Sequence, residues 1–229
     1  MPDPVRIAVI DSGVHPAHPH IDAARLLPGV AVTGDGTIDA NADATLDRLG
    51  HGTAVMAAIQ EMAPAALCIP LRIFGDSLRT TARALVTAID WAIDAKVDLV
   101  NLSLGTTNAA HRPAFMAAAA RAKAAGTLIV AARENGEIPC YPGCLPDAIG
   151  VALDWECPRD VWWVERKDDG LHFRTSGHPR PIPGVPQQRN LHGVSFAVAN
   201  MTGHAARYRT DRGVLSPDEL AAFAPFAGS

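Results

Sequence analysis

Apolar residues in this chain fall into short continuous runs that alternate with segments of helical periodicity. The run at residues 5–10, VRIAVI, is typical of a strand buried on both faces of a sheet. Residues 80–95 instead carry apolar side chains three and four positions apart, which predicts an amphipathic helix. The alternation continues along the chain and predicts strands at 66–73, 97–102 and 127–132 and helices at 51–63, 112–125 and from 195 onward.

This strand–helix repetition predicts an α/β fold, because parallel strands need crossover connections that cover both faces of a sheet. We therefore expect three layers, with a mostly parallel sheet between two layers of helices. After residue 153 the pattern changes: residues 161–167 and 171–175 read as a hairpin on an Asp-Gly turn. A proline-rich stretch follows, and Ser216 begins a short terminal helix. No repeat or linker is apparent, so residues 1–229 are expected to form one domain.

Composition narrows the function classes. Of 229 residues 48% are apolar, the net charge is −4, and no basic run appears, which argues against nucleic acid or an anionic membrane as the main partner. The sequence contains no apolar span of 18 residues, so it predicts no membrane-crossing helix. The chain enters a strand at residue 5, leaving no room for a signal peptide, so we expect a cytoplasmic protein.

The four cysteines, Cys68, Cys140, Cys144 and Cys157, are too few and too scattered for a disulfide scaffold. We expect reduced thiols, with a Cys140–Cys144 bridge as the alternative. In the polar stretch 34–50, Asp39, Asn41 and Asp43 alternate as calcium ligands do. The glycine and distal glutamate of a calcium loop are missing, so a solvated loop and no cofactor are favoured over calcium.

Three polar residues occupy places suited to chemistry. Asp11 ends the first strand, where groups at the carboxyl ends of parallel strands collect. His51 stands between two glycines at the start of an apolar helix, and neutral histidine is the most available general base near pH 7. Ser195 follows a glycine by two residues at another helix start. Taken singly, each also fits a structural role: a turn aspartate, a buried histidine and a helix cap.

Taken together, Ile10-Asp11-Ser12-Gly13, Gly50-His51-Gly52-Thr53 and Gly193-Val194-Ser195-Phe196-Ala197 resemble the subtilisin-like serine peptidases (peptidase S8) in motif and order. The resemblance runs from about residue 5 to 207. It implies Ser195 as nucleophile, His51 as general base and acid, and Asp11 as the group that orients the imidazolium. It also implies that strand 99–103 pairs with an extended substrate.

The family's oxyanion segment, Ala-Ala-Gly-Asn-x-Gly, is altered here to Ala131-Ala132-Arg133-Glu134-Asn135-Gly136. Counted from Gly126, Asn135 takes the position of the oxyanion donor; counted back from Gly136, Glu134 does. An ionised glutamate cannot donate a hydrogen bond, so Asn135 is assigned. The resemblance then implies this set of substrate-binding residues: Leu102, Ser103, Leu104, Gly105, Ala132 and Glu134.

Glu134 replaces a glycine beside the pocket for the side chain before the cut bond. A carboxylate there predicts cleavage after basic residues; the alternative is that Glu134 turns to solvent or to a surface arginine.

The resemblance implies an endopeptidase that cuts an extended peptide or protein segment. The chain is short for the family and starts without its prodomain, which favours a dedicated processing enzyme. An inactive peptide-binding pseudo-peptidase is the alternative, resting on the altered oxyanion segment. A nucleotide-binding α/β protein fits less well, because no glycine-rich phosphate loop follows the first strand.

Overall fold

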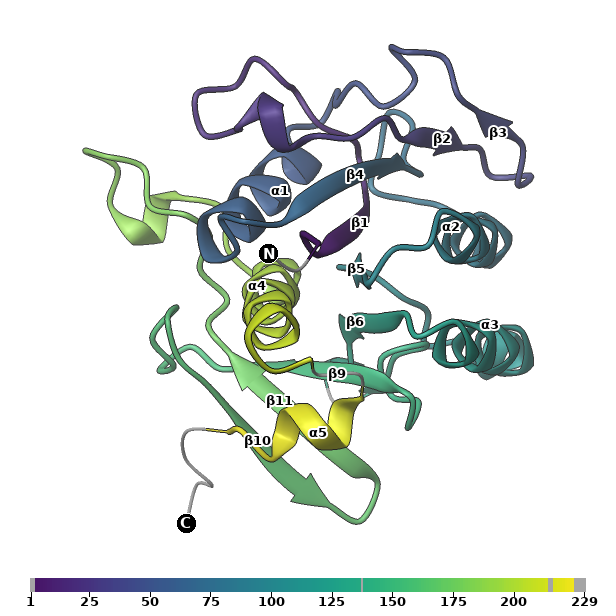
Figure 1. The fold of residues 1–229 in the computed structure, drawn as a ribbon, viewed down its shortest axis with the longest axis vertical. Helices are drawn as coiled ribbons and strands as arrows, with labels where there is room; N and C mark the ends of the chain where they lie inside the picture. Colours follow the sequence, from purple (N-terminus) through teal and green to yellow (C-terminus); the bar gives the residue numbers. More distant parts are fainter. Residues whose placement is uncertain (1–2, 137, 214–215, 225–229) are drawn as a thin grey trace.

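A twisted nine-stranded sheet runs through the protein, in a computed structural model that describes residues 3–136, 138–213 and 216–224 (Figure 1). The strand order is β10-β11-β9-β6-β5-β1-β4-β2-β3. Neighbours are parallel except β10 with β11 and β2 with β3, at the two edges. The strands are β1 (Arg6–Asp11), β2 (Val30–Val32), β3 (Ile38–Asp39), β4 (Leu67–Arg72), β5 (Leu99–Leu102), β6 (Leu128–Ala132), β9 (Ala148–Leu153), β10 (Trp162–Lys167) and β11 (Gly170–Thr175).

Helices cover both faces of this sheet, which confirms the predicted three-layer fold. Figure 1 shows α1 (His51–Met62) and α4 (Val194–Arg212) on one face, and α2 (Ala82–Asp94) and α3 (Arg112–Ala124) on the other. The short α5 (Pro217–Ala221) begins at its N-cap Ser216, as expected, and packs near β11.

Strand β1 lies in the middle of the sheet, and its side chains alternate between two cores. Ile7 and Val9 pack with α1 and α4, whereas Ala8 and Ile10 pack with α2 and α3. All four are at most 1% exposed. Because both faces of the strand are buried, its sequence is a continuous apolar run rather than an alternating one.

Helices α1 and α4 touch closely, since a Cβ placed on Gly203 of α4 would collide with the side chain of Met62 at the end of α1. Glycine at this position lets the two helix axes approach. The contact matters because the N-termini of these two helices carry His51 and Ser195.

The structure adds elements that the pattern did not predict. The stretch 34–50, expected to be a loop, contains β3, which pairs with the equally unexpected β2. A second, two-stranded sheet joins β7 (Glu134–Asn135) to β8 (Ile138–Pro139). Strands this short are held by backbone hydrogen bonds to a neighbour, and two or three residues are too few to show a period. The hairpin expected at 161–175 is present as β10 and β11.

All four cysteines are free thiols in the structure, and Cys140 and Cys144 are not bonded to each other. Asp39 and Asn41 form a local turn, in which the Asp39 carboxylate accepts from the Asn41 backbone (3.0 Å) and side chain. None of the described helices is both long and apolar enough to cross a membrane.

Candidate active site

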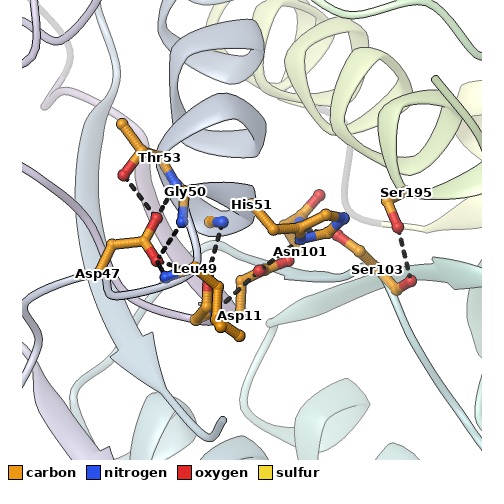
Figure 2. A network of polar contacts seen from close by, with 11 residues as sticks. Asp11, Asp47, Leu49, Gly50, His51, Thr53, Asn101, Ser103 and Ser195 are labelled. Carbon is orange, nitrogen blue, oxygen red and sulfur yellow. Dashed lines mark hydrogen bonds and ion pairs between the residues drawn. The ribbon is translucent and has the colours of Figure 1, made fainter. Parts of the chain in front are cut away.

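The candidate residues meet at the carboxyl-terminal edge of the parallel strands. Asp11 is the last residue of β1, and Ser103 follows directly after β5. His51 is the first residue of α1 and Ser195 the second of α4. Figure 2 shows the His51 imidazole between the Asp11 carboxylate and the Ser195 side chain. Residues separated by up to 184 positions in the chain are thereby brought into one site.

Asp11 and His51 form a short hydrogen bond, with 2.7 Å between Asp11 Oδ1 and His51 Nδ1. The same carboxylate oxygen accepts from the backbone amide of Ser12 at 2.7 Å. Asp11 is 1% exposed, and among the described residues its second oxygen, Oδ2, has no hydrogen-bond partner. A buried carboxylate bonded to Nδ1 leaves the Nε2 side of the ring as the face available for proton transfer.

Burial of the His51 imidazole opposes its protonation, but the hydrogen bond that it donates to Asp11 and the negative charges of Asp11 and Asp47 outweigh that effect. Together they raise the pKa of His51 above its ordinary value. The imidazolium is therefore stabilised at the position where a general base would hold a proton.

His51 is positioned by two side chains that cap α1 from outside the helix. The Ser12 hydroxyl accepts from the Gly52 amide (2.8 Å), and the Asp47 carboxylate accepts from the Thr53 amide (2.8 Å). A Cβ on Gly52 would collide with the backbone of Gly13, so only glycine permits this close approach of α1 to the end of β1. The caps satisfy first-turn amides that have no partner within the helix.

Asp47 holds this arrangement together and is the residue that sequence reasoning missed. It is 9% exposed and accepts five hydrogen bonds: from the Ser12 hydroxyl (2.9 Å), the Leu49 and Gly50 amides (both 2.9 Å), the Thr53 amide (2.8 Å) and the Thr53 hydroxyl (2.6 Å) (Figure 2). Burial alone raises the pKa of this carboxyl, but the donors, Thr53 first, lower it overall. An acidic residue just before a helix start was the available signal.

Ser195 lies in the first turn of α4, after a glycine whose backbone only glycine adopts readily: Gly193 has φ 142°. The Ser195 hydroxyl donates to the carbonyl oxygen of Ser103 at 3.4 Å, a long hydrogen bond. The ring of the next residue, Phe196, lies 5.9 Å from the His51 ring, centroid to centroid.

A buried polar link joins β5 to α4. Asn101 donates to the Ser103 hydroxyl (3.1 Å) and accepts from the Thr202 hydroxyl (2.9 Å). Asn101 and Thr202 are both 0% exposed. The link holds Ser103 against the helix that carries Ser195.

The altered segment after β6 contains the two-residue strand β7, which lies outside the main sheet. Asn135 is exposed on β7 and Glu134 is half-buried. Among the described residues Glu134 has neither an ion pair nor a side-chain hydrogen bond, and it does not pair with a surface arginine. Arg133, in contrast, is 5% exposed and bonds Asp169 (2.6 Å) and His172 (2.9 Å) on the β10–β11 hairpin.

The structure limits how the expected substrate-binding residues, which stay a prediction, can meet a substrate. Residues 99–102 cannot receive a substrate strand, because β5 has β1 on one side and β6 on the other. The side chains of Leu102 and Ala132 are 0% and 4% exposed and lie in the two cores. The stretch Ser103–Leu104–Gly105 lies beyond the end of β5 and outside the sheet, and the next residue, Thr106, pairs with Tyr141.

The part of the chain that the structure describes contains no cluster of three or more histidine, cysteine or acidic side chains suited to a metal ion. Of the candidate calcium ligands, Asp39 bonds Asn41 within a local turn, and Asn41 and Asp43 are exposed.

The fold and these motifs define a class: α/β proteins of the subtilisin type. The model of the subtilase family (Peptidase S8) matches residues 3–161, more than half of the chain, and the protein belongs to this family. It is 24% identical over 218 residues to Subtilisin E from Bacillus subtilis (strain 168), covering 88% of this chain and 52% of that protein. Subtilisin DY from Bacillus licheniformis is 26% identical over 235 residues, covering 94% and 80%.

The chain thus spans about half the length of several curated relatives that it matches. Solved structures share the fold at low sequence identity. Sphericase superimposes with a TM-score of 0.70 at 22% identity, covering 95% of this chain and 81% of that chain. The nisin leader peptidase NisP from Lactococcus lactis does so with a TM-score of 0.67 at 18% identity, covering 97% and 82%.

Proposed function

We propose that the protein is a serine endopeptidase that cuts peptide bonds through Asp11, His51 and Ser195. One observation carries the proposal: the 2.7 Å bond between buried Asp11 and His51, at the helix start that faces Ser195 (Figure 2). A family relationship alone would not separate an active enzyme from an inactive relative, whereas an intact base–carboxylate pair favours activity.

In the proposed reaction the Ser195 hydroxyl turns from the Ser103 carbonyl toward His51 Nε2. His51 takes the hydroxyl proton while Oγ attacks the substrate carbonyl carbon, and Asp11 stabilises the resulting imidazolium. His51 then gives that proton to the leaving amine as the C–N bond breaks, which leaves an acyl-enzyme on Ser195. Water, deprotonated by His51, hydrolyses this ester. The raised pKa of His51 supports its role as proton acceptor.

The oxyanion of the tetrahedral intermediate is proposed to accept hydrogen bonds from the Asn135 side chain and from the first-turn amides of α4. The Val194 and Ser195 amides precede the first hydrogen bond of the helix, which the Phe196 amide donates to the Gly193 carbonyl at 3.0 Å. The exposed position of Asn135 on the short β7 strand leaves its side-chain amide accessible to a substrate.

The substrate is proposed to lie extended along Ser103–Leu104–Gly105, and Glu134 to favour a basic residue before the cut bond. The half-buried Glu134 carboxylate lacks a cationic partner among the described residues, and a substrate lysine or arginine would supply one. Peptides that differ only in Arg or Leu at this position test the idea with wild type and Glu134→Gln. A preference for Leu in wild type, or an Arg preference that survives the substitution, would contradict it.

We further propose a dedicated processing role in the cytoplasm. The nisin leader peptidase shares this fold, which supports removal of a leader from a peptide precursor as the reaction type. The four free thiols support a reducing compartment. Cell fractionation and the cleavage profile of a peptide library test the two parts separately.

A fluorophosphonate probe tests the central proposal, because it reacts with a serine hydroxyl that a neighbouring base activates. We expect labelling of the wild type and none of Ser195→Ala or His51→Ala, with the folded far-UV spectrum retained in all three. Folded wild-type protein that is neither labelled nor able to cut any library peptide would instead favour the peptide-binding pseudo-peptidase.

A further inference from the structure

A cavity of about 500 Å³ opens beside the start of α1, between the segment 15–20 that follows β1 and the proline-rich segment 179–191. Arg180 joins the two segments: it donates to the His20 carbonyl at 3.0 Å, and its own carbonyl accepts from Asn190 at 3.1 Å. The cavity volume lies within the range of pockets that bind small molecules, and exceeds what one side chain fills.

The lining of this cavity is cationic. Arg48 and Arg189 are exposed and have no ion-pair partner among the described residues. Arg180 lies 3.7 Å from Glu61, a carboxylate that also pairs with Arg159 at 2.7 Å.

Three histidines, at positions 15, 18 and 20, complete the polar lining. The acidic residue in the lining is Asp47, whose two oxygens are already occupied by five donors. A cavity of this charge contrasts with the net charge of −4 of the whole chain. The lining also has an apolar part, formed by Ala54, Ala57, Ile182 and Leu191.

The cavity lies on the side of the site from which the leaving amine departs. Gly50 and Thr53 in its lining flank His51, and Leu191 precedes Ser195 by four residues. In Figure 2, Asp47 and Thr53 lie on one side of His51, and Ser103 lies on the other. Since His51 gives its proton to the leaving amine, the peptide on the amine side of the cut bond is directed toward α1 and this cavity.

We propose that this cavity binds a carboxylate carried by the leaving segment, within its first three residues after the cut bond. The inference rests on the proposed peptidase activity and adds a substrate preference to it. Arg48, Arg180 and Arg189 supply the charge, and the apolar part of the lining accommodates the aliphatic part of an acidic side chain. The carboxylate belongs either to an aspartate or glutamate side chain or to the free carboxyl terminus of a short leaving segment.

Quenched peptides that differ at one position test the cleavage preference. Glu, Gln or Lys is placed singly at the first, second or third residue after the cut bond, with the carboxyl terminus amidated; a second set has free carboxyl termini. For at least one position we expect kcat/KM to be about fivefold to tenfold higher with Glu than with Gln, and lowest with Lys. A gain confined to free carboxyl termini would identify the terminal carboxylate as the ligand.

The double variant Arg48→Gln/Arg189→Gln should remove most of the Glu preference and leave cleavage of the Gln peptide unchanged. Arg166→Gln is the matched control, because Arg166 is an exposed arginine on β10, paired with Asp218 at 3.5 Å. The control should keep the full preference. Equal rates for Glu, Gln and Lys at all three positions, in an enzyme that cuts all of them, would overturn the carboxylate site while leaving the peptidase proposal intact.

Binding provides a readout that does not need turnover. Fluorescence anisotropy with Ser195→Ala should show a lower Kd for the Glu peptide than for the Gln peptide, and the difference should vanish in the triple variant Ser195→Ala/Arg48→Gln/Arg189→Gln. A preference in binding without any cleavage by wild type would refute the peptidase activity and retain the site. Equal binding of both peptides would refute the site.

Discussion

At the scale of single residues, the environment of His51 depends on two carboxylates with different tasks. Asp11 bonds the imidazole directly, whereas Asp47 bonds the helix start beneath it. Asp47 contributes its negative charge to the raised pKa of His51 and also fixes the backbone that carries the ring. The effect of the Asp47 charge on the pKa can be separated by experiment from the effect of the helix-start geometry, because Ser12 also bonds the helix start but carries no charge.

Asp47→Asn removes the charge and keeps the size of the side chain. The catalytic base must be unprotonated to act, so the acid limb of kcat/KM should lie above pH 6.5 in wild type, following the raised pKa of His51. Loss of the Asp47 charge lowers that pKa, and the limb should move to lower pH. The measurement is the pH profile of kcat/KM. Loss of charge-assisted hydrogen bonds should also cost about 1–3 kcal/mol of unfolding free energy.

Ser12→Ala is the matched control. It removes the cap on the Gly52 amide and one donor to Asp47, and keeps both carboxylates. We expect a lower kcat with an unmoved acid limb. Equal displacement of the limb in both variants would mean that the geometry at the start of α1, rather than the charge of Asp47, sets the pKa.

Asn135→Ala tests the oxyanion assignment. An interaction made only in the transition state lowers kcat and leaves KM nearly unchanged, and the loss should be about 10²–10³-fold, the magnitude known for subtilisin itself. Steady-state kinetics on one peptide suffices, with Glu134→Gln as the neighbouring control, for which kcat on a Leu peptide should be retained. An unchanged kcat in Asn135→Ala would exclude this side chain as the oxyanion donor.

At the scale of elements, Arg133 ties the oxyanion segment to the β10–β11 hairpin. Its buried guanidinium donates to the Asp169 carboxylate, the Asp169 carbonyl and His172, at 2.6, 2.8 and 2.9 Å. The contacts with His172 first and then with Arg133 lower the pKa of Asp169 to about 2. The hairpin therefore stabilises a segment that its own two-residue strands hold only weakly.

Arg133→Met should reduce the unfolding free energy by about 1–3 kcal/mol, because it leaves the buried His172 ring nitrogen without this donor and removes the charge-assisted bond to Asp169. Denaturant unfolding at neutral pH measures this. The control Arg174→Met removes a more exposed arginine on the same hairpin, which pairs with Glu165 at 3.1 Å, and should cost under about 1 kcal/mol. Equal losses in both variants would show that the buried network adds nothing beyond an ordinary ion pair.

At the scale of the whole molecule, the fold buries a histidine that contributes to its acid sensitivity. His204 in α4 is 4% exposed and bonds the Arg159 carbonyl at 3.2 Å. Burial, opposed by that hydrogen bond, lowers the pKa of His204 to about 4. Between pH 6.5 and about 4 the unfolded chain therefore binds more protons at this residue than the folded protein does, and stability falls as the pH falls through this window.

His204→Gln should remove this contribution. Between pH 6.5 and 4, the unfolding free energy of wild type should decrease by about 2–3 kcal/mol more than that of the variant. Denaturant unfolding across this range measures the difference, with exposed His111→Gln as the control that should follow wild type. His51 contributes to the pH dependence of stability with the opposite sign, because its raised pKa stabilises the fold at low pH. This contribution cancels in the comparison of wild type with the variants, since all of them retain His51. Parallel curves for wild type and His204→Gln would refute the prediction.

The sequence by itself determined the fold class, the order of the main strands and helices, and the candidates Asp11, His51 and Ser195. Apolar periodicity records which face of each element is buried, and β1 shows it as a run buried on both sides. The three candidates were recognisable because each lies within two residues of a glycine at the end of an element, and because the three motifs occur together in the order typical of the family.

Only the tertiary structure decided which residues from distant parts of the chain contact one another. The Ser12 donor to Asp47, the partners of Arg133 and the occupied edges of β5 come from segments far apart in the chain, and no local pattern encodes such pairings. The sequence of residues 99–103 specifies a strand, but strand order decides whether an edge is free, and β1 and β6 occupy both edges of residues 99–102. The cationic cavity likewise exists only where residues 15–20, 48–57 and 179–191 meet. Local physics selects the elements, and their packing decides which charges and hydrogen-bonding groups face one another.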